Sequence, residues 1–331
     1  MEITNFKNQT KFGTIYQIGY STVACTISGL AYLFRENVSN LVLVMAVLHV
    51  LHYFLRIKFL GESISFYHAA GQFGKLSELL GKVCDTNKVG LSDKNEIIKI
   101  ENLKRIQNEE SFFADKESET GNISLSKILL ENKKILKTTV IMCIIWSVLN
   151  INYYGLVLST GMLSTSLFLT CAVSGLAECV GVSTYKLLCD HPKLGRKYSS
   201  VFYFGLCWVF CWLTGFLQIF GENAIPKFII GICFCIARLS TAAFYAVIMQ
   251  WTNEIFPTVI KNQTMGLCNF MGYLSSTICP IILATARVFP TLPIFVFGGF
   301  ALISMILCLF PPETLGKEPI HLIGQAKRLY K

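Results

Sequence analysis

The sequence predicts an all-α polytopic membrane protein, and three observations support this fold class. Hydrophobic residues make up 53% of the 331 residues and charged residues only 15%, which is too apolar for a soluble chain of this length. About eight apolar runs of roughly 20 residues follow one another, each long enough to cross ~30 Å of hydrocarbon as a helix. Lysine and arginine gather in alternate connections between the runs, as in a chain that crosses a membrane repeatedly.

The apolar runs define the membrane spans that we expect. Polar or charged residues bound each run, and the connections between the last six runs are short. The expected spans are Phe12–Phe34, Leu41–Leu60, Lys137–Val157, Leu163–Leu187, Ser199–Phe220, Pro226–Gln250, Gly266–Ala286 and Pro293–Phe310. An even number of spans places both termini on the same side of the membrane.

The distribution of charge gives the orientation. A formal net charge of +9 could indicate a nucleic-acid partner, but the basic residues are spread over alternate loops and form no single patch. The connections that hold Arg35, Lys227 and Arg287 are poor in lysine and arginine, and those on the other side are rich in them. By the positive-inside rule we expect cytoplasmic termini in a multi-pass protein of the plasma membrane. Its expected surroundings are the lipid bilayer and not nucleic acid.

Four parts of the chain differ in composition. Residues 1–60 hold two spans, and residues 61–134 form a long polar segment with charges of both signs. Within that segment, residues 66–83 and 94–106 show apolar residues at helical spacing, which predicts short helices in a cytoplasmic linker. Residues 135–312 hold six closely spaced spans, and residues 313–331 form a polar cytoplasmic tail. The sequence therefore predicts two helices, a linker and a six-helix bundle.

The stretch from Trp146 to Lys197 holds the residues that point to a function. Its first apolar helix carries Trp146, Asn150, Tyr153 and Tyr154, and its second carries Glu178. A carboxylate at bilayer depth costs roughly 2.5 kcal/mol or more, and chains keep one where it faces a cavity or a partner. Two hypotheses follow: these residues line a cavity for a solute, or they form an aromatic packing stripe with a structural ion pair.

The motifs of this stretch resemble those of a known family. The residues Asn152-Tyr153-Tyr154-Gly155, then Ser159-Thr160-Gly161 and Ser174-Gly175-Leu176-Ala177-Glu178, are similar to the seventh and eighth helices of the organic cation/anion/carnitine transporters (solute carrier family 22). The run from Asn253 to Asn262 resembles that family's A-E-L-Y-P-T-x-x-R-N, and the run from Pro312 to Lys317 its P-E-T-x-G-K. The family belongs to the major facilitator superfamily.

The resemblance covers helices five to twelve of a twelve-helix fold. It implies an incomplete N-terminal bundle of two helices followed by a complete six-helix C-terminal bundle. Two motifs depart from the family pattern. The turn D-R-x-G-R-R is split between Asp190 and Gly195-Arg196-Lys197, as if two residues were inserted. The run P-E-S-P-R-W is reduced to the residues from Gly61 to Phe66.

The resemblance also implies a site near the bilayer midplane, between two bundles that rock about it. It implies that aromatic residues line the cavity, because ring faces attract organic cations by about 0.5–2 kcal/mol each. The family's charge-selecting position in the eleventh helix falls on Tyr273, which is neither acidic nor basic. The implied substrate-binding residues are Trp146, Asn150, Tyr153, Tyr154, Glu178, Arg238, Tyr273 and Gln17.

A second group of residues is expected to act as a conformational latch. Asp190, Gly195, Arg196 and Lys197 lie in the turn after the eighth helix of the family fold, and Glu254 follows the tenth. Opposite charges at these helix ends predict an ion pair that forms and breaks during transport. The latch touches no solute.

We expect a transmembrane transporter of small organic ions that works by alternating access, with organic cations favoured because Tyr16-Gln17 resembles the cation branch. Organic anions or zwitterions such as carnitine are a second possibility. A chain without the first four helices could instead be a transport-inactive fragment or a membrane protein that acts through a partner. No Gly-rich phosphate loop, metal-ligand cluster or nucleophile–base pair is readable, so we expect no enzyme and no cofactor. The oligomeric state has no signature in the sequence.

Overall fold

The computed structural model describes residues 9–59, 73–87, 129, 131–160, 167–220, 227–256 and 258–317, which form helices and turns without strands. The chain divides into two compact units, residues 1–9 with 42–124 and residues 10–41 with 125–331. Each unit has its own internal packing, and each is described by itself.

The first unit contains most of helix α2 (Val38–Phe59) and helix α4 (Phe73–Thr86). Most of the 22 residues of α2 are apolar, and Arg56 and Lys58 lie in its last turn. On α4, Lys82 pairs with Glu78 one turn earlier, at 2.7 Å. The helix α4 overlaps the short helix expected over residues 66–83. Residues 66–72 and the helix expected over residues 94–106 lie outside the described residues.

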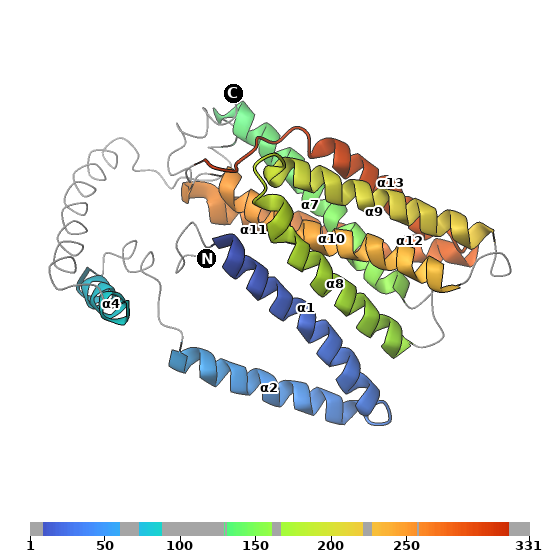
Figure 1. Ribbon diagram of the computed structural model, residues 1–331, viewed down its shortest axis with the longest axis horizontal. Coiled ribbons are helices and arrows are strands. Elements are labelled where there is room, and N and C mark those ends of the chain that lie inside the picture. The colour runs from blue at the N-terminus through green and yellow to red at the C-terminus, as the bar shows by residue number, and fades with distance from the viewer. Residues whose placement is uncertain are drawn as a thin grey trace. The chain divides into compact units, whose positions relative to one another are not determined.

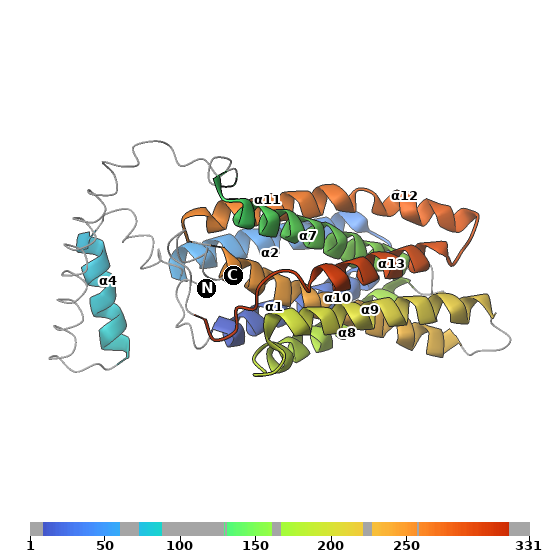
Figure 2. The ribbon, with the colours of Figure 1, turned by 90° about the horizontal axis from the view of Figure 1, so that it is seen from above.

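The second unit is a helical bundle. In both views of the ribbon, α7, α9, α10 and α13 lie side by side (Figures 1 and 2). The bundle consists of α1 (Gln9–Leu33), α7 (Lys133–Ser159), α8 (Leu167–Cys189), α9 (Gly195–Ile219), α10 (Lys227–Ile255), α11 (Thr258–Ser276), α12 (Cys279–Ala284), the 3₁₀ turn η3 (Thr285–Arg287) and α13 (Leu292–Leu307). The helix α10 packs on α8 and α9, α11 packs on α7, and α13 packs on both α7 and α9.

Large apolar side chains fill the centre of this bundle. The core includes Trp146 of α7, Phe204 of α9, Phe244 and Trp251 of α10, and Phe297 of α13, all almost fully buried. The rings of Phe204 and Phe244 lie 4.0 Å apart between their centroids. Each of these rings removes a large apolar area from its surroundings, so the core joins helices that are distant in the sequence.

Five of the described helices are long and apolar enough to cross a membrane. These are Val38–Lys58, Lys133–Ser159, Gly195–Ile219, Phe228–Ile255 and Ile260–Arg287, and Leu292–Leu307 is a shorter apolar helix. The helices α1 and α8, with 25 and 23 residues, reach about 35 Å at 1.5 Å per residue. The all-helical membrane protein predicted from the sequence is confirmed. Its division into a two-helix and a six-helix bundle stays a prediction.

The span expected over Gly266–Ala286 is interrupted. The helix α11 begins at Thr258 and ends at Ser276, and α12 begins at Cys279 with Pro280 in its first turn. Proline has no N–H to donate to the carbonyl four residues earlier, and its ring clashes with that carbonyl, so a continuous helix is disfavoured at this point. The break lies next to α7, because the Cys279 thiol donates to the carbonyl oxygen of Ile151 at 3.3 Å.

A glycine allows α8 and α10 to approach each other closely. A Cβ atom at Gly181 of α8 would collide with the backbone carbonyl oxygen of Leu239 in α10. Backbone atoms cannot move aside as the end of a flexible side chain can. The contact brings α8 and α10 together one residue after Arg238, so the spacing of these two helices depends on Gly181.

The substitution Gly181→Ala tests this contact. We expect it to destabilise the bundle by about 1–3 kcal/mol, because the added methyl group overpacks the space between α8 and α10. The measurement is the melting temperature of the purified full chain in detergent, followed by tryptophan fluorescence.

The matched control is Gly231→Ala in α10, where an added Cβ meets no atom within 4 Å. Alanine is the better helix former by about 1 kcal/mol, so this variant should melt at or above the wild-type temperature. Equal melting temperatures for the two variants would contradict the packing described for Gly181.

Candidate functional site

One cavity lies among the helices of the second unit. Its volume is about 230 Å³. Five helices line it, each with side chains that are aromatic, polar or small. The lining residues are Tyr16, Gln17 and Tyr20 of α1, Tyr153 and Tyr154 of α7, Glu178 and Val182 of α8, Ala242, Tyr245 and Met249 of α10, and Asn269 and Tyr273 of α11.

Six of the twelve residues that line the cavity are tyrosines. The Tyr153 ring lies 5.3 Å from that of Tyr154 and 5.4 Å from that of Tyr245, measured between centroids. The Tyr154 ring lies 6.2 Å from that of Tyr273. Aromatic faces carry negative potential and attract cations, most strongly where water is excluded. Four of the lining tyrosines, Tyr153, Tyr154, Tyr245 and Tyr273, thus form one connected group of rings.

A buried ion pair lies beside the rings. The Glu178 carboxylate accepts a hydrogen bond from the Tyr153 hydroxyl at 2.8 Å and another from Arg238 Nη2 at 2.9 Å. The side chains of Glu178 and Arg238 are each only 5% exposed. Removing two charges from water costs several kcal/mol per ion, and only close pairing with further hydrogen bonds offsets that cost. The pair therefore joins α8 to α10 at the edge of the cavity.

The guanidinium of Arg238 makes two further contacts. Its Nε donates to Ser174 Oγ at 3.2 Å, and its Cζ lies 4.4 Å from the centroid of the Tyr153 ring. Its Nη1 is buried and has no hydrogen-bond partner among the residues that the structure describes. Arg238 of α10 thus contacts both α7 and α8, while its Nη1 donates no hydrogen bond to any described residue.

Most of the residues predicted from the sequence meet at this cavity. Gln17, Tyr153, Tyr154, Glu178 and Tyr273 line it directly. Arg238 contacts two of the lining residues, Tyr153 and Glu178, without being part of the lining itself.

Two more of the predicted residues, Trp146 and Asn150, also lie outside the lining. Trp146 is fully buried, donates its indole N–H to Thr252 Oγ1 at 3.0 Å and packs edge-on against Tyr245, with 5.8 Å between centroids. The Asn150 amide donates to the carbonyl oxygen of Trp146 at 2.9 Å and packs against Gly272 of α11. Their assignment to solute binding stays a prediction. Trp146 could affect a bound solute only through Tyr245, and Asn150 only through α11.

Sequence reasoning did not identify several lining residues. Tyr245 lies seven residues after Arg238, and Asn269 lies four residues before Tyr273. Spacings of four and seven place side chains on one face of a helix, so both could have been found from their neighbours. Tyr20 follows Tyr16 by one turn in the same way. Met249, Ala242 and Val182 carry no comparable signal.

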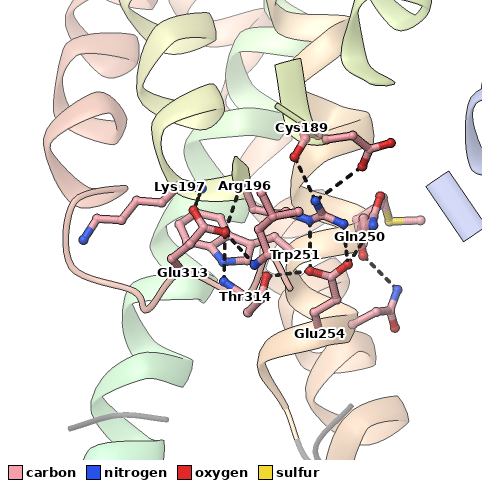
Figure 3. A network of polar contacts seen from close by, with 12 residues as sticks. Cys189, Arg196, Lys197, Gln250, Trp251, Glu254, Glu313 and Thr314 are labelled. Atoms are coloured by element: carbon pink, nitrogen blue, oxygen red, sulfur yellow. Dashed lines mark hydrogen bonds and ion pairs between the residues drawn. The ribbon is translucent and has the colours of Figure 1, made fainter. Parts of the chain in front are cut away.

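The predicted latch forms a compact polar cluster, shown in Figure 3. Arg196 Nε and Nη2 donate to the two carboxylate oxygens of Glu254 at 3.1 and 3.0 Å. Its Nη1 donates to the carbonyl oxygen of Cys189 at 2.8 Å and lies 3.5 Å from Asp190 Oδ1. A planar guanidinium that meets a carboxylate with two parallel bonds is a strong and directional pair. Every nitrogen of Arg196 is satisfied.

Glu313 belongs to the same cluster, although sequence reasoning placed it only within a family motif. Its carboxylate accepts the backbone N–H groups of Arg196 at 3.0 Å and Lys197 at 2.9 Å, at the start of α9 (Figure 3). A negative charge at a helix N-terminus is favourable because the first N–H groups have no partner within the helix. Lys197 takes part in these contacts through its backbone. Gly195 has a φ of 60° and abuts the Glu313 carboxylate.

The C-terminal segment closes the cluster. Thr314 donates its hydroxyl to Glu254 Oε2, and Gln250 donates to Glu254 Oε1 at 2.7 Å. Trp251 donates its indole N–H to the carbonyl oxygen of Pro312 at 3.0 Å. The latch therefore joins the turn between α8 and α9, the end of α10 and the segment after α13.

Known proteins with similar sequences share the family named from the motifs, although no family model matches the chain. "Solute carrier family 22 member 15" of Xenopus tropicalis is 28% identical over 191 residues, 56% of this chain and 35% of that protein. "Solute carrier family 22 member 13" of Homo sapiens is 22% identical over 311 residues, 93% of this chain and 52% of that protein. "Organic cation/carnitine transporter 4" of Arabidopsis thaliana is 25% identical over 306 residues, 90% of this chain and 53% of that protein.

The chain thus spans about half the length, or less, of the curated relatives that it matches. The alignments confirm the resemblance. By its motifs and by its alignments, this chain is similar to the solute carrier family 22 proteins, which are carriers and not enzymes.

Proposed function

We propose that the chain is a transporter, or part of one, that moves small organic ions across a membrane, with organic cations favoured. The observation that carries this proposal is the cavity itself, where six tyrosines and the Glu178 carboxylate lie around one small volume. Rings and a single carboxylate are the groups that bind an organic cation. No covalent chemistry on the solute is required.

Alternating access is the proposed mechanism, because the contacts around the cavity differ in strength. The contacts of α1 with α8 include weak sulfur contacts, with Thr22 Oγ1 3.9 Å from Cys179 Sγ and Cys25 Sγ 3.6 Å from the carbonyl oxygen of Ala172. Within the six-helix part, charged hydrogen bonds and ring packing hold the helices together. A seam of weak contacts beside a firmly bonded bundle supports motion of α1 relative to α8, which would open the cavity.

The proposed arrangement in the membrane follows the sequence. Residues 1–60 would supply two helices of the first bundle, residues 61–134 a cytoplasmic linker, and residues 135–312 the second bundle. Both termini, including the tail at 313–331, would lie in the cytoplasm of a plasma-membrane protein. The latch would then lie at the cytoplasmic end of the second bundle.

Removing the Tyr153 ring tests the cavity. We expect Tyr153→Leu to weaken the binding of tetraethylammonium by about 3- to 30-fold, because a ring face contributes about 0.5–2 kcal/mol to binding a cation. The measurement is radiolabelled uptake and equilibrium binding by the full chain in proteoliposomes.

The control for the ring is Tyr198→Leu in α9, an exposed tyrosine outside the cavity lining. It should leave binding unchanged. If Tyr153→Leu binds and transports tetraethylammonium as the wild type does, Tyr153 has no role in solute binding.

A charge at Tyr273 should change selectivity. This side chain lines the cavity, so a carboxylate there would lie beside a bound solute. We expect Tyr273→Asp to raise the ratio of tetraethylammonium uptake to para-aminohippurate uptake roughly tenfold, since a nearby opposite charge contributes about 1–3 kcal/mol. Tyr273→Asn has nearly the same shape without the charge and should leave the ratio near that of the wild type. Equal ratios for Asp and Asn would exclude Tyr273 as a selecting position.

The latch should govern the rate and not the affinity. We expect Glu254→Gln to slow uptake roughly tenfold while the Kd of tetraethylammonium changes less than about threefold, because a hydrogen bond to a charged group contributes about 1.5–3 kcal/mol. The exchange Arg196→Glu with Glu254→Arg restores opposite charges and should recover part of the rate. A matching loss of affinity in Glu254→Gln would mean that the latch acts on the cavity directly.

A further inference from the structure

We infer that Arg238 acts as a built-in cation that competes with the solute, by holding Glu178 and the face of Tyr153 with its own guanidinium. The arginine would thereby set how strongly the cavity attracts cations, and a soluble guanidinium compound could take its place when the side chain is removed. This inference rests on the proposed function, because it concerns the same cavity.

The contacts of Arg238 are those that the cavity would offer to a soluble cation. The guanidinium carbon lies 4.4 Å from the Tyr153 ring centroid, which is within range for a cation on an aromatic face. Its Nη2 donates to Glu178 at 2.9 Å and its Nε to Ser174 at 3.2 Å. A ring, a carboxylate and a hydroxyl together already bind one guanidinium.

The two buried arginines of the bundle differ in how completely they are bound. Arg196 meets Glu254 with two parallel hydrogen bonds, and its third nitrogen is also satisfied. Arg238 meets Glu178 through one nitrogen, and its Nη1 has no partner among the described residues. A buried donor without an acceptor loses about 1–3 kcal/mol of hydration without compensation. Arg238 is therefore the less firmly bound of the two and the easier to exchange.

Charge balance gives Arg238 its effect on the cavity. Among the described residues that line the cavity, only Glu178 carries a formal charge, and Arg238 neutralises this charge through the ion pair. Tyr153 also belongs to both sites, since it lines the cavity while its ring and hydroxyl contact Arg238 and Glu178. Removal of the arginine charge would leave a buried carboxylate with one neutral partner, and a cation would then be attracted far more strongly.

Chemical rescue of Arg238→Ala tests the inference. The purified full chain in detergent is titrated with methylguanidinium chloride, with urea as the neutral planar analogue and sodium chloride as the salt control. The melting temperature is followed by tryptophan fluorescence, which requires no transport. We expect Arg238→Ala to bind methylguanidinium at least roughly tenfold more tightly than the wild type, with no matching effect of urea or sodium chloride.

Three further variants make the result specific. Arg238→Lys keeps the positive charge and should respond to methylguanidinium as weakly as the wild type. Arg238→Ala combined with Glu178→Gln removes both charges and should lose the response. Arg238→Gln keeps most of the side-chain volume, so it serves where Arg238→Ala does not fold, and its affinity for methylguanidinium should also rise roughly tenfold.

Two outcomes would overturn the inference. One is a methylguanidinium affinity in Arg238→Ala or Arg238→Gln equal to that of the wild type. The other is failure of both variants to fold even when methylguanidinium is present throughout purification, which would make Arg238 a structural residue only. Uptake of tetraethylammonium by the wild type is measured in parallel. Rescue without any uptake would refute the transport proposal alone, and uptake without rescue would refute this inference alone.

Discussion

The ion pair between Glu178 and Arg238 is the constraint on which the rest of the bundle depends. Two charges enclosed among apolar helices are tolerable only when they meet each other and when further groups complete their hydrogen bonds. Tyr153 and Ser174 supply two such groups from α7 and α8, while Arg238 Nη1 has no partner among the described residues. These polar contacts act together with the close approach of α8 and α10 at Gly181, so the apolar core packs around helices that are held at fixed distances.

The helix α10 connects the two polar sites of the bundle. It carries Arg238 at the cavity and Glu254 at the latch, sixteen residues apart, which is about 24 Å at 1.5 Å per residue. The core residues Phe244 and Trp251 lie between these positions. A shift of α10 along or about its axis would change the contacts at both ends. If the cluster around Arg196 acts as the proposed latch, α10 would be the element that couples it to the cavity.

The helices could be predicted from the sequence because an apolar run of about 20 residues has few stable structures other than a membrane-spanning helix. The motif residues Tyr153 and Glu178 were readable as well, since charges and rings inside such runs require an explanation. Arg196 lies in a turn outside the apolar runs, and only the family motif indicated it. The assembly of the cavity was not readable, because Tyr245 and Asn269 come from helices whose mutual rotation depends on tertiary packing. The position of Trp146 was not readable for the same reason. It shares a face of α7 with Tyr153, but it is fully buried against Tyr245 and does not line the cavity.

The interruption between Ser276 and Cys279 has a mechanical consequence. The carbonyl of Ser276 lacks the amide donor that an unbroken helix would bring from four residues later, because Pro280 occupies that position. The two pieces of this span share no complete ladder of hydrogen bonds, so they can pivot about the joint. Tyr273 lies one turn before this joint, in α11. One end of the span could therefore swing while the wall of the cavity keeps its shape.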